Sequence, residues 1–294
     1  MRRAVIDLGT NTFNLLIADT QTRQVLFQTK EGVALGMGGI NEKRLSPAAI
    51  QRAFEALQKF KDKCDALEVN AIRAIGTSAM RDATNANELI EKVATELKIS
   101  IEVISGLQEA ELIYKGVALS HIFDEPALIM DIGGGSTEFI VADLKGPILA
   151  HSFDIGVSRL FQLFDYQDPL SIQDIERVEN YLNQHCAHFF KQQLPKVLIG
   201  ASGSFETFYE LMAQAVFDPQ GAAVQVDASE FKFMLDHIIA STQAERNANP
   251  HILEIRKRMA PLAAIKTRWV LKIAQIEHIY ISPYSLKEGA LFGL

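Results

Sequence analysis

The chain has 294 residues, 48% of them hydrophobic and 22% charged, a size and balance that favour two globular domains. Its formal net charge of −7 argues against nucleic-acid binding, because that affinity comes mainly from phosphate contacts made by Lys and Arg. Its two cysteines have no close partner, no stretch approaches the roughly 18 apolar residues of a membrane span, and no secretory signal opens the chain, so we expect a cytoplasmic protein with no membrane contact.

The first part of the chain alternates strand and helix patterns, which predicts an α/β unit. A buried strand at 4–8 and a second strand at 13–19 are joined by a tight glycine-containing turn. Ser46 and Pro47 are typical of the cap and first residue of a helix, and the apolar residues that follow have helical spacing. Further strands are expected at 24–29, 71–76 and 101–104, and further helices at 86–97 and 105–119.

The second part of the chain predicts another α/β unit. Strands are expected at 127–132, 138–143, 148–154, 196–200 and 278–281. Two helices are expected around 157–190 and one from Phe205, residues 218–228 are expected to form a loop, and most of the chain beyond it has a helical pattern.

The two units contain an internal repeat. The segment AVIDLGTNTFNLLIAD (4–19) can be laid on LIMDIGGGSTEFIVAD (128–143), so that Asp7 corresponds to Asp131. Each segment has a strand with an acidic residue near its end, a glycine turn with hydroxyl side chains, and a second strand. The repeat predicts two related lobes, each of which presents one hairpin turn.

The composition of these turns is suited to phosphate binding. Glycine allows the backbone to approach a ligand closely and to direct N–H groups outward. Hydroxyl groups add short donors, and aspartates at the strand ends can hold a divalent cation beside a phosphate chain. Either turn alone is compatible with an ordinary hairpin, but both in the same register favour a clamp for polyphosphate.

Seven stretches, in family order, resemble the exopolyphosphatase/guanosine pentaphosphate phosphohydrolase (Ppx/GppA) family within the sugar kinase/actin/heat-shock-chaperone ATPase superfamily. They are IDLGTNTFNLLIAD (6–19), GTSAMRDATNA (76–86), VISGLQEAELIYKGV (103–117), LIMDIGGGSTEFIVAD (128–143), FDIGVSRLFQLF (153–164), GASGSF (200–205) and YSLKEGALFGL (284–294). The resemblance is to the short, two-domain form. It implies an α/β protein with a two-lobed actin-like ATPase (ribonuclease H-like) fold and an active-site cleft between the lobes.

The lobes are expected at residues 1–120 and 121–294, with the last helix (285–294) packing on the first lobe. The resemblance implies release of a terminal phosphate from inorganic polyphosphate or guanosine pentaphosphate, with Mg²⁺ or another divalent cation and a role in the bacterial stringent response. It also suggests a homodimer. A superfamily kinase and a slow-turnover polyphosphate or alarmone sensor remain as alternative functions.

Glu109 aligns with the family's catalytic glutamate, and we expect it to be the general base. It falls in the first turn of a predicted helix, where the helix dipole favours the ionised carboxylate; a solvent-facing glutamate is the alternative. Arg81 aligns with a family arginine implied to contact phosphate; the alternative is an exposed arginine paired with Asp82. Gln108 and Glu111 depart from the family's usual Glu and Arg, which makes the surroundings of Glu109 less positive.

The remaining candidate residues fall into three sets. Phosphate binding is expected of Thr10, Asn11, Thr12, Gly133, Gly134, Gly135, Ser136, Gly203 and Ser204. Cation contact is expected of Asp131, Glu138 and Asp7. A basic set is compatible with a track for a polyanion, although a solvated helix face is the favoured interpretation; it comprises Arg256, Lys257, Arg258, Lys266, Arg268 and Lys272.

Overall fold

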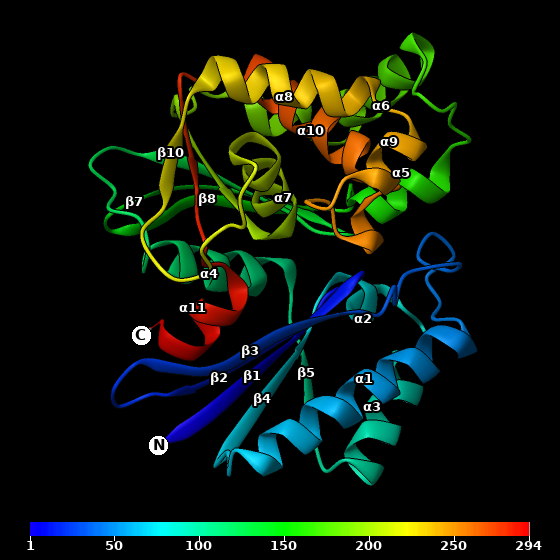
Figure 1. The fold of residues 1–294 in the computed structure, drawn as a ribbon, viewed down its shortest axis with the longest axis vertical. Helices are drawn as coiled ribbons and strands as arrows, with labels where there is room; N and C mark the ends of the chain where they lie inside the picture. The colour runs from blue at the N-terminus through cyan, green and yellow to red at the C-terminus, as the bar shows by residue number, and fades with distance from the viewer. Residues whose placement is uncertain (294) are drawn as a thin grey trace.

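The computed structural model describes residues 1–293, and strands within residues 2–103 form a five-stranded mixed sheet (Figure 1). The strands are β1 (Arg2–Leu8), β2 (Thr12–Asp19), β3 (Gln24–Gly32), β4 (Ala71–Gly76) and β5 (Ile101–Val103), in the order β3-β2-β1-β4-β5. Strand β1 pairs antiparallel with β2 and parallel with β4. Helices α1 (Pro47–Ala66) and α3 (Ala86–Glu96) cover one face of this sheet.

The second sheet repeats this arrangement. Its strands are β6 (Ala127–Ile132), β7 (Thr137–Asp143), β8 (Gly146–Phe153), β9 (Val197–Ala201), β10 (Val224–Val226) and β11 (His278–Ile281), in the order β10-β11-β9-β6-β7-β8. Strand β6 pairs antiparallel with β7 and parallel with β9, as β1 does with β2 and β4. Helices α6 (Ile172–Cys186), α8 (Ala228–Ala240) and α10 (Ala260–Ile273) pack on the sheet's outer side.

The register of the two hairpins is the same. Asp7 lies opposite Asn14 in the first hairpin, and Asp131 lies opposite Glu138 in the second. The internal repeat therefore corresponds to a repeated folding unit. The molecule has the predicted α/β architecture, the two-lobed actin-like ATPase fold built from two ribonuclease H-like units.

Alternation along the central strands directs their acidic residues toward the space between the lobes. A hydrophobic cluster between the sheets contains Val5 of β1, Ile129 of β6 and Leu286. Asp7 and Asp131 each lie two residues beyond Val5 and Ile129, and side chains two residues apart in a strand share a face. The two-residue alternation of side chains along β1 and β6 thus places both carboxylates on the faces of the sheets that point toward the other lobe.

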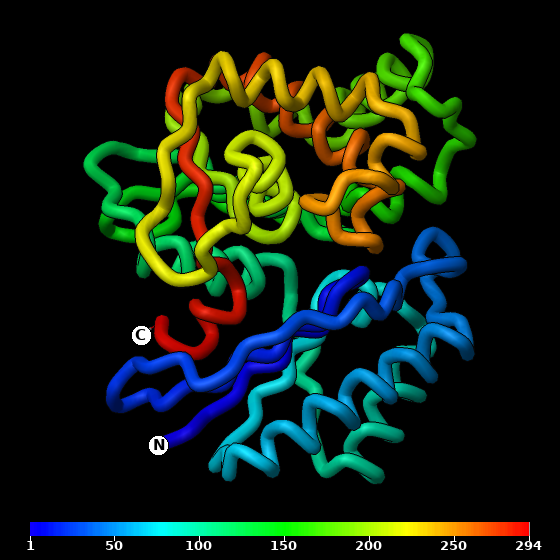
Figure 2. The backbone as a smooth tube through the Cα atoms, viewed as in Figure 1, coloured from blue at the N-terminus to red at the C-terminus, as the bar shows by residue number. Residues whose placement is uncertain are grey.

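Two helices occupy that interlobe layer. Helix α4 (Gly106–Val117) follows β5, and helix α11 (Leu286–Phe292) returns from the second sheet to pack on α4, β1 and β2. Figure 2 shows this return, with α11 lying beside the strands of the first sheet. The chain passes to the second sheet through residues 118–126, and we propose the lobe boundary at residue 120 within this segment.

Three local elements differ from the sequence-based predictions. Strand β10 forms within the predicted loop, because it pairs antiparallel with the edge of β11. Helix α7 (Ser202–Ala213) begins before Phe205, because the backbone turns at Ser202 in the left-handed region, with φ of 66°. The short helix α2 (Ser78–Asp82) was not expected.

The remaining helical elements include α5 (Val157–Leu163), α9 (Gln243–Ala248) and two 3₁₀ helices, Ala187–Lys191 and Glu254–Arg256. Helix α5 and the segment Glu254–Arg256 both reach the cleft between the lobes. Within residues 1–293, every helix is too short or too polar to cross a lipid bilayer.

Candidate active site between the lobes

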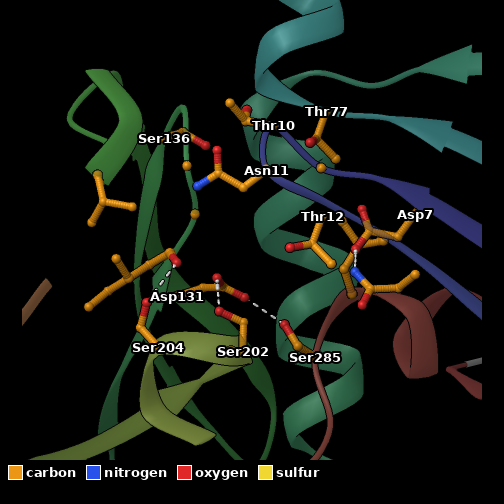
Figure 3. Close-up of a pocket in the computed structure, with 18 of the residues that line it drawn as sticks. Asp7, Thr10, Asn11, Thr12, Thr77, Asp131, Ser136, Ser202, Ser204 and Ser285 are labelled. Carbon is orange, nitrogen blue, oxygen red and sulfur yellow. Dashed lines mark hydrogen bonds between the residues drawn. The ribbon is translucent and has the colours of Figure 1, made fainter. Parts of the chain in front are cut away.

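The two glycine turns face each other across one pocket. A side chain at Gly134 would lie 2.8 Å from the amide of Asn11, and one at Gly135 would lie 2.6 Å from the hydroxyl of Thr10. In Figure 3 the side chain of Asn11 points toward the loop that carries Ser136. Only glycine at 134 and 135 allows the turns to approach this closely.

The glycine loop is fixed by its carbonyl groups. The backbone N–H groups of residues 156, 157 and 158 donate to the carbonyls of Gly135, Gly133 and Gly134. Within residues 1–293, no hydrogen-bond acceptor is found for the N–H groups of Gly134 and Gly135. The loop therefore has backbone donors suited to an anion in the pocket.

Thirteen of the fourteen candidate residues line this pocket; Arg81 does not. The thirteen are Asp7, Thr10, Asn11, Thr12, Glu109, Asp131, Gly133, Gly134, Gly135, Ser136, Glu138, Gly203 and Ser204. They come from both lobes and from α4, so the fold brings together residues that are distant in the sequence.

Asp131 is held by two serine hydroxyls from separate segments. Ser202 donates to Oδ1 at 2.7 Å, and Ser285 donates to Oδ2 at 2.6 Å, as Figure 3 shows. The left-handed backbone of Ser202 stores strain at the junction of β9 and α7. Both oxygens of Asp131 are thereby oriented, although burial raises its pKa.

Two further carboxylates are buried in the same pocket. Asp7 accepts a hydrogen bond from Asn14 at 2.9 Å, and burial raises its pKa to about 6. Glu138 accepts one from Ser152 at 2.6 Å, and burial, together with the charge of Asp131, raises its pKa to about 7. Carboxylates crowded in a buried site favour binding of a cation or a proton.

These carboxylates do not form an all-protein metal cage. Among residues 1–293, no three His, Cys, Asp or Glu side chains converge in a way that could hold one ion. The donor set instead fits a Mg²⁺ ion bound by one or two carboxylates, with water and substrate oxygens completing its shell. Asp131 and Glu138 are the candidates, and Asp7 lies across the cleft.

Glu109 is buried rather than solvent-facing. Its side chain is 9% exposed, and Arg81 donates to its Oε2 at 2.9 Å. Burial and the negative charge of Glu138 raise the pKa of Glu109 well above its ordinary value, despite the opposing charge of Arg81. Burial and the charge of Glu138 thus oppose the effect that the helix dipole is expected to have on this carboxylate.

Arg81 lies behind Glu109 rather than on the pocket wall. Its Nη1 donates both to Glu109 and to the carbonyl of Ile104, at 3.1 Å. Asp82, the partner considered from the sequence, is bound by Arg159 of α5 instead. This arrangement suits Arg81 to hold Glu109 in place.

The third candidate loop lies beside an unexpected arginine. A side chain at Gly203 would collide with the guanidinium of Arg256, and Ser204 contacts the carbonyl of Ile132 at 3.5 Å. Arg256 lines the pocket, whereas Lys266, only 1% exposed, donates to Thr137 and to the carbonyl of Ile155. The basic set does not form one solvated face.

Several pocket residues were not identified as site candidates from the sequence. They are Asn14, Lys30, Thr77, Ser78, Glu206, Ser285 and Lys287. Ser285 falls in a stretch that carries the family resemblance, which was a usable signal. Lys30 and Glu206 carry no local signal, because only the fold brings them together.

The repeated lobes and the pocket between their facing turns define a two-lobed protein of the actin-like ATPase fold with a cleft suited to phosphate. The model of the Ppx/GppA phosphatase family matches residues 16–294. The chain therefore belongs to that family.

Known proteins similar to this chain agree with that assignment. An exopolyphosphatase from Cytophaga hutchinsonii is 36% identical, with a TM-score of 0.96 over 99% of this chain and 97% of that one. A PPX-GPPA enzyme from Aquifex aeolicus is 25% identical, with a TM-score of 0.83 over 100% and 99%. A guanosine-5'-triphosphate,3'-diphosphate pyrophosphatase from Aeromonas salmonicida is 27% identical over 99% of this chain, which spans 59% of that relative's length.

Proposed function

We propose that this protein is a phosphohydrolase that removes the terminal phosphoryl group of inorganic polyphosphate or guanosine pentaphosphate. The observation that carries the proposal is the pair of facing glycine turns above a pocket that contains Glu109. Family membership and the names of the similar proteins support the reaction class.

In the proposed reaction, the N–H groups of Gly134 and Gly135 and the hydroxyl of Thr10 bind the terminal phosphoryl oxygens. Glu109 accepts a proton from the attacking water, and its raised pKa makes it a stronger base than a free glutamate. Arg81 positions that carboxylate. A divalent cation beside Asp131 and Glu138 would screen the charge of the phosphate chain and polarise a phosphoryl oxygen.

The test compares phosphate release from polyphosphate, guanosine pentaphosphate and ATP, with Mg²⁺, by the wild type and by Glu109→Gln. We expect the variant to lose about 10²–10⁴-fold in kcat, because general-base catalysis contributes that much. Glu111→Gln is the matched control, since Glu111 is on the same helix and its side chain is 57% exposed. Equal activity of wild type and Glu109→Gln would contradict the assignment of the base.

The same assay separates the alternative functions. Consumption of ATP only in the presence of a hydroxyl acceptor would indicate a kinase. Tight binding of phosphate chains without turnover would indicate a sensor. The cytoplasmic setting, the stringent-response role and the homodimer remain predictions from the sequence, to be checked by fractionation, growth under starvation and light scattering.

A further inference from the structure

A cluster of opposite charges forms one wall of the pocket. Lys30 Nζ lies 2.9 Å from Glu206 Oε2, and Arg256 Nη1 lies 3.6 Å from the same oxygen. Lys287 also lines this wall, and its Nζ lies 2.9 Å from Glu288 Oε1. Two of these cations therefore share a single carboxylate oxygen.

The cluster joins three segments that are far apart in the sequence. Lys30 extends from β3 of the first lobe, and Glu206 belongs to α7 of the second. Arg256 ends a 3₁₀ helix, and its guanidinium lies against Gly203, where any side chain would collide with it. The close approach at Gly203 brings Arg256 to the pocket wall.

Glu206 behaves as an internal anion. Burial opposes its ionisation, but the charges of Lys30, Arg256 and Lys287 lower its pKa to about 2. Glu206 therefore remains charged near neutral pH and occupies donors that are well suited to a phosphate oxygen. Guanidinium and ammonium groups are the side chains that usually bind phosphate.

We propose that Lys30 and Arg256 form a second phosphate subsite in this cleft, and that Glu206 competes with the substrate for it. The subsite takes a phosphoryl group further along the chain than the one beside Glu109. This inference rests on the proposed function for its substrate, but the competition between Glu206 and an anion is testable by binding alone.

The geometry supports a competition rather than a purely structural ion pair. The side chain of Lys30 is 43% exposed and that of Glu206 is 22% exposed, and both line the pocket. An anion in the pocket can therefore reach both. A polyphosphate chain carries several negative charges and several acceptor oxygens, whereas Glu206 offers one charge and two oxygens. The polyphosphate chain can accept from Lys30 and Arg256 together once Glu206 withdraws.

The first test measures binding of tripolyphosphate by calorimetry, with no divalent cation, so that hydrolysis does not interfere. We expect Glu206→Gln to bind about tenfold more tightly than wild type, and Lys30→Gln about tenfold more weakly, the change expected for one charge-assisted contact. The double variant Lys30→Gln/Glu206→Gln should fall between the two. Weaker or unchanged binding by Glu206→Gln would overturn the proposal.

Matched controls are available in an exposed pair elsewhere. Lys196 and Glu277 form a surface ion pair outside the pocket, so Lys196→Gln and Glu277→Gln make the same charge changes there. Equal effects of these variants and the pocket variants would mean that only net charge matters, and would overturn the subsite. Thermal unfolding verifies that each variant is folded.

Steady-state kinetics separates this proposal from the proposed function. If wild type hydrolyses polyphosphate, Lys30→Gln should raise KM about tenfold with little change in kcat, whereas Glu109→Gln lowers kcat. If no substrate is hydrolysed but the binding changes occur, the subsite stands and the hydrolase assignment fails. If Glu109→Gln abolishes hydrolysis but Lys30→Gln changes neither KM nor the affinity for tripolyphosphate, the subsite fails and the hydrolase assignment stands.

Discussion

The residues that matter most in the cleft are buried polar groups with specific partners. Asp131 accepts from two serines, Glu138 from Ser152, and Glu109 from Arg81. Each hydrogen bond orients a carboxylate that burial would otherwise disfavour. The cleft is therefore prepared for a charged ligand before the ligand arrives, which is how electrostatic stabilisation in enzymes usually operates.

Gly135→Ala tests the contact between the two turns. A Cβ at this position would lie 2.5 Å from the hydroxyl oxygen of Ser78 and 2.6 Å from that of Thr10, so the turns must separate. We expect kcat/KM for the phosphohydrolase reaction to fall about 100-fold, because small displacements of positioning groups have effects of that size.

The control for this variant is Gly133→Ala. Its Cβ would lie 3.1 Å from the carbonyl oxygen of Ser136 within the same loop, and would not contact the opposite turn. We expect a clearly smaller loss of kcat/KM. Equal losses in the two variants would mean that the loop itself, rather than the contact between turns, is disturbed.

At the scale of elements, helices α4 and α11 form the layer that supports the site. Helix α4 carries Glu109, and α11 follows Ser285 and carries Lys287. The two helices approach so closely that a Cβ at Gly116 would lie 1.9 Å from the carbonyl oxygen of Ser285. A shift in this packing would displace functional groups on both helices.

Gly116→Ala tests that packing. In an isolated helix, the change from glycine to alanine stabilises by about 1 kcal/mol. Here we expect a loss of about 1–3 kcal/mol in the free energy of unfolding, because overpacking forces the helices apart. Urea denaturation measures it, with the exposed substitution Glu111→Ala on the same helix as control. Stabilisation by Gly116→Ala would show that α4 and α11 can accommodate a methyl group at this position, and would contradict the close packing.

At the scale of the molecule, a buried arginine joins the two lobes on one side of the cleft. Arg159 of α5 donates from Nε to the carbonyl of Gly135 at 2.7 Å and from Nη1 to the carbonyl of Ile40 at 3.2 Å. Its Nη2 binds Asp82 of α2. One side chain thus connects the glycine loop to two segments of the first lobe.

Arg159→Gln is expected to lower the free energy of unfolding by about 2 kcal/mol, since it leaves Asp82 and two carbonyls without their charged partner. We also expect a higher KM, because the lobes are less firmly aligned. Arg73→Gln is the control, because the side chains of Arg73 and its partner Glu102 are 43% and 50% exposed and exposed pairs contribute little. An Arg159 variant as stable as the control would contradict the role of Arg159 as the interlobe connection.

Much of the fold was predictable because its signals are local. The strands at the two hairpins, the helix that begins after Ser46 and the helix that begins after Ser105 follow from alternation, spacing and capping residues. The repeat between residues 4–19 and 128–143 predicted the duplicated unit. Strand β10 was missed because its three residues are too few to show strand alternation, and the strand forms only where a sheet edge is available.

The sequence by itself determined which residue types line the cleft: glycines in both turns, carboxylates at the strand ends and Glu109 in a helix. Only the tertiary structure decided their partners. In the folded protein, Glu109 is buried against Arg81, and Asp131 accepts hydrogen bonds from Ser202 and Ser285. Glu206 lies between Lys30 of the first lobe and Arg256 of the second. The physical reason is that turns and periodicities depend on neighbouring residues, whereas burial and charge pairing depend on segments joined only by folding.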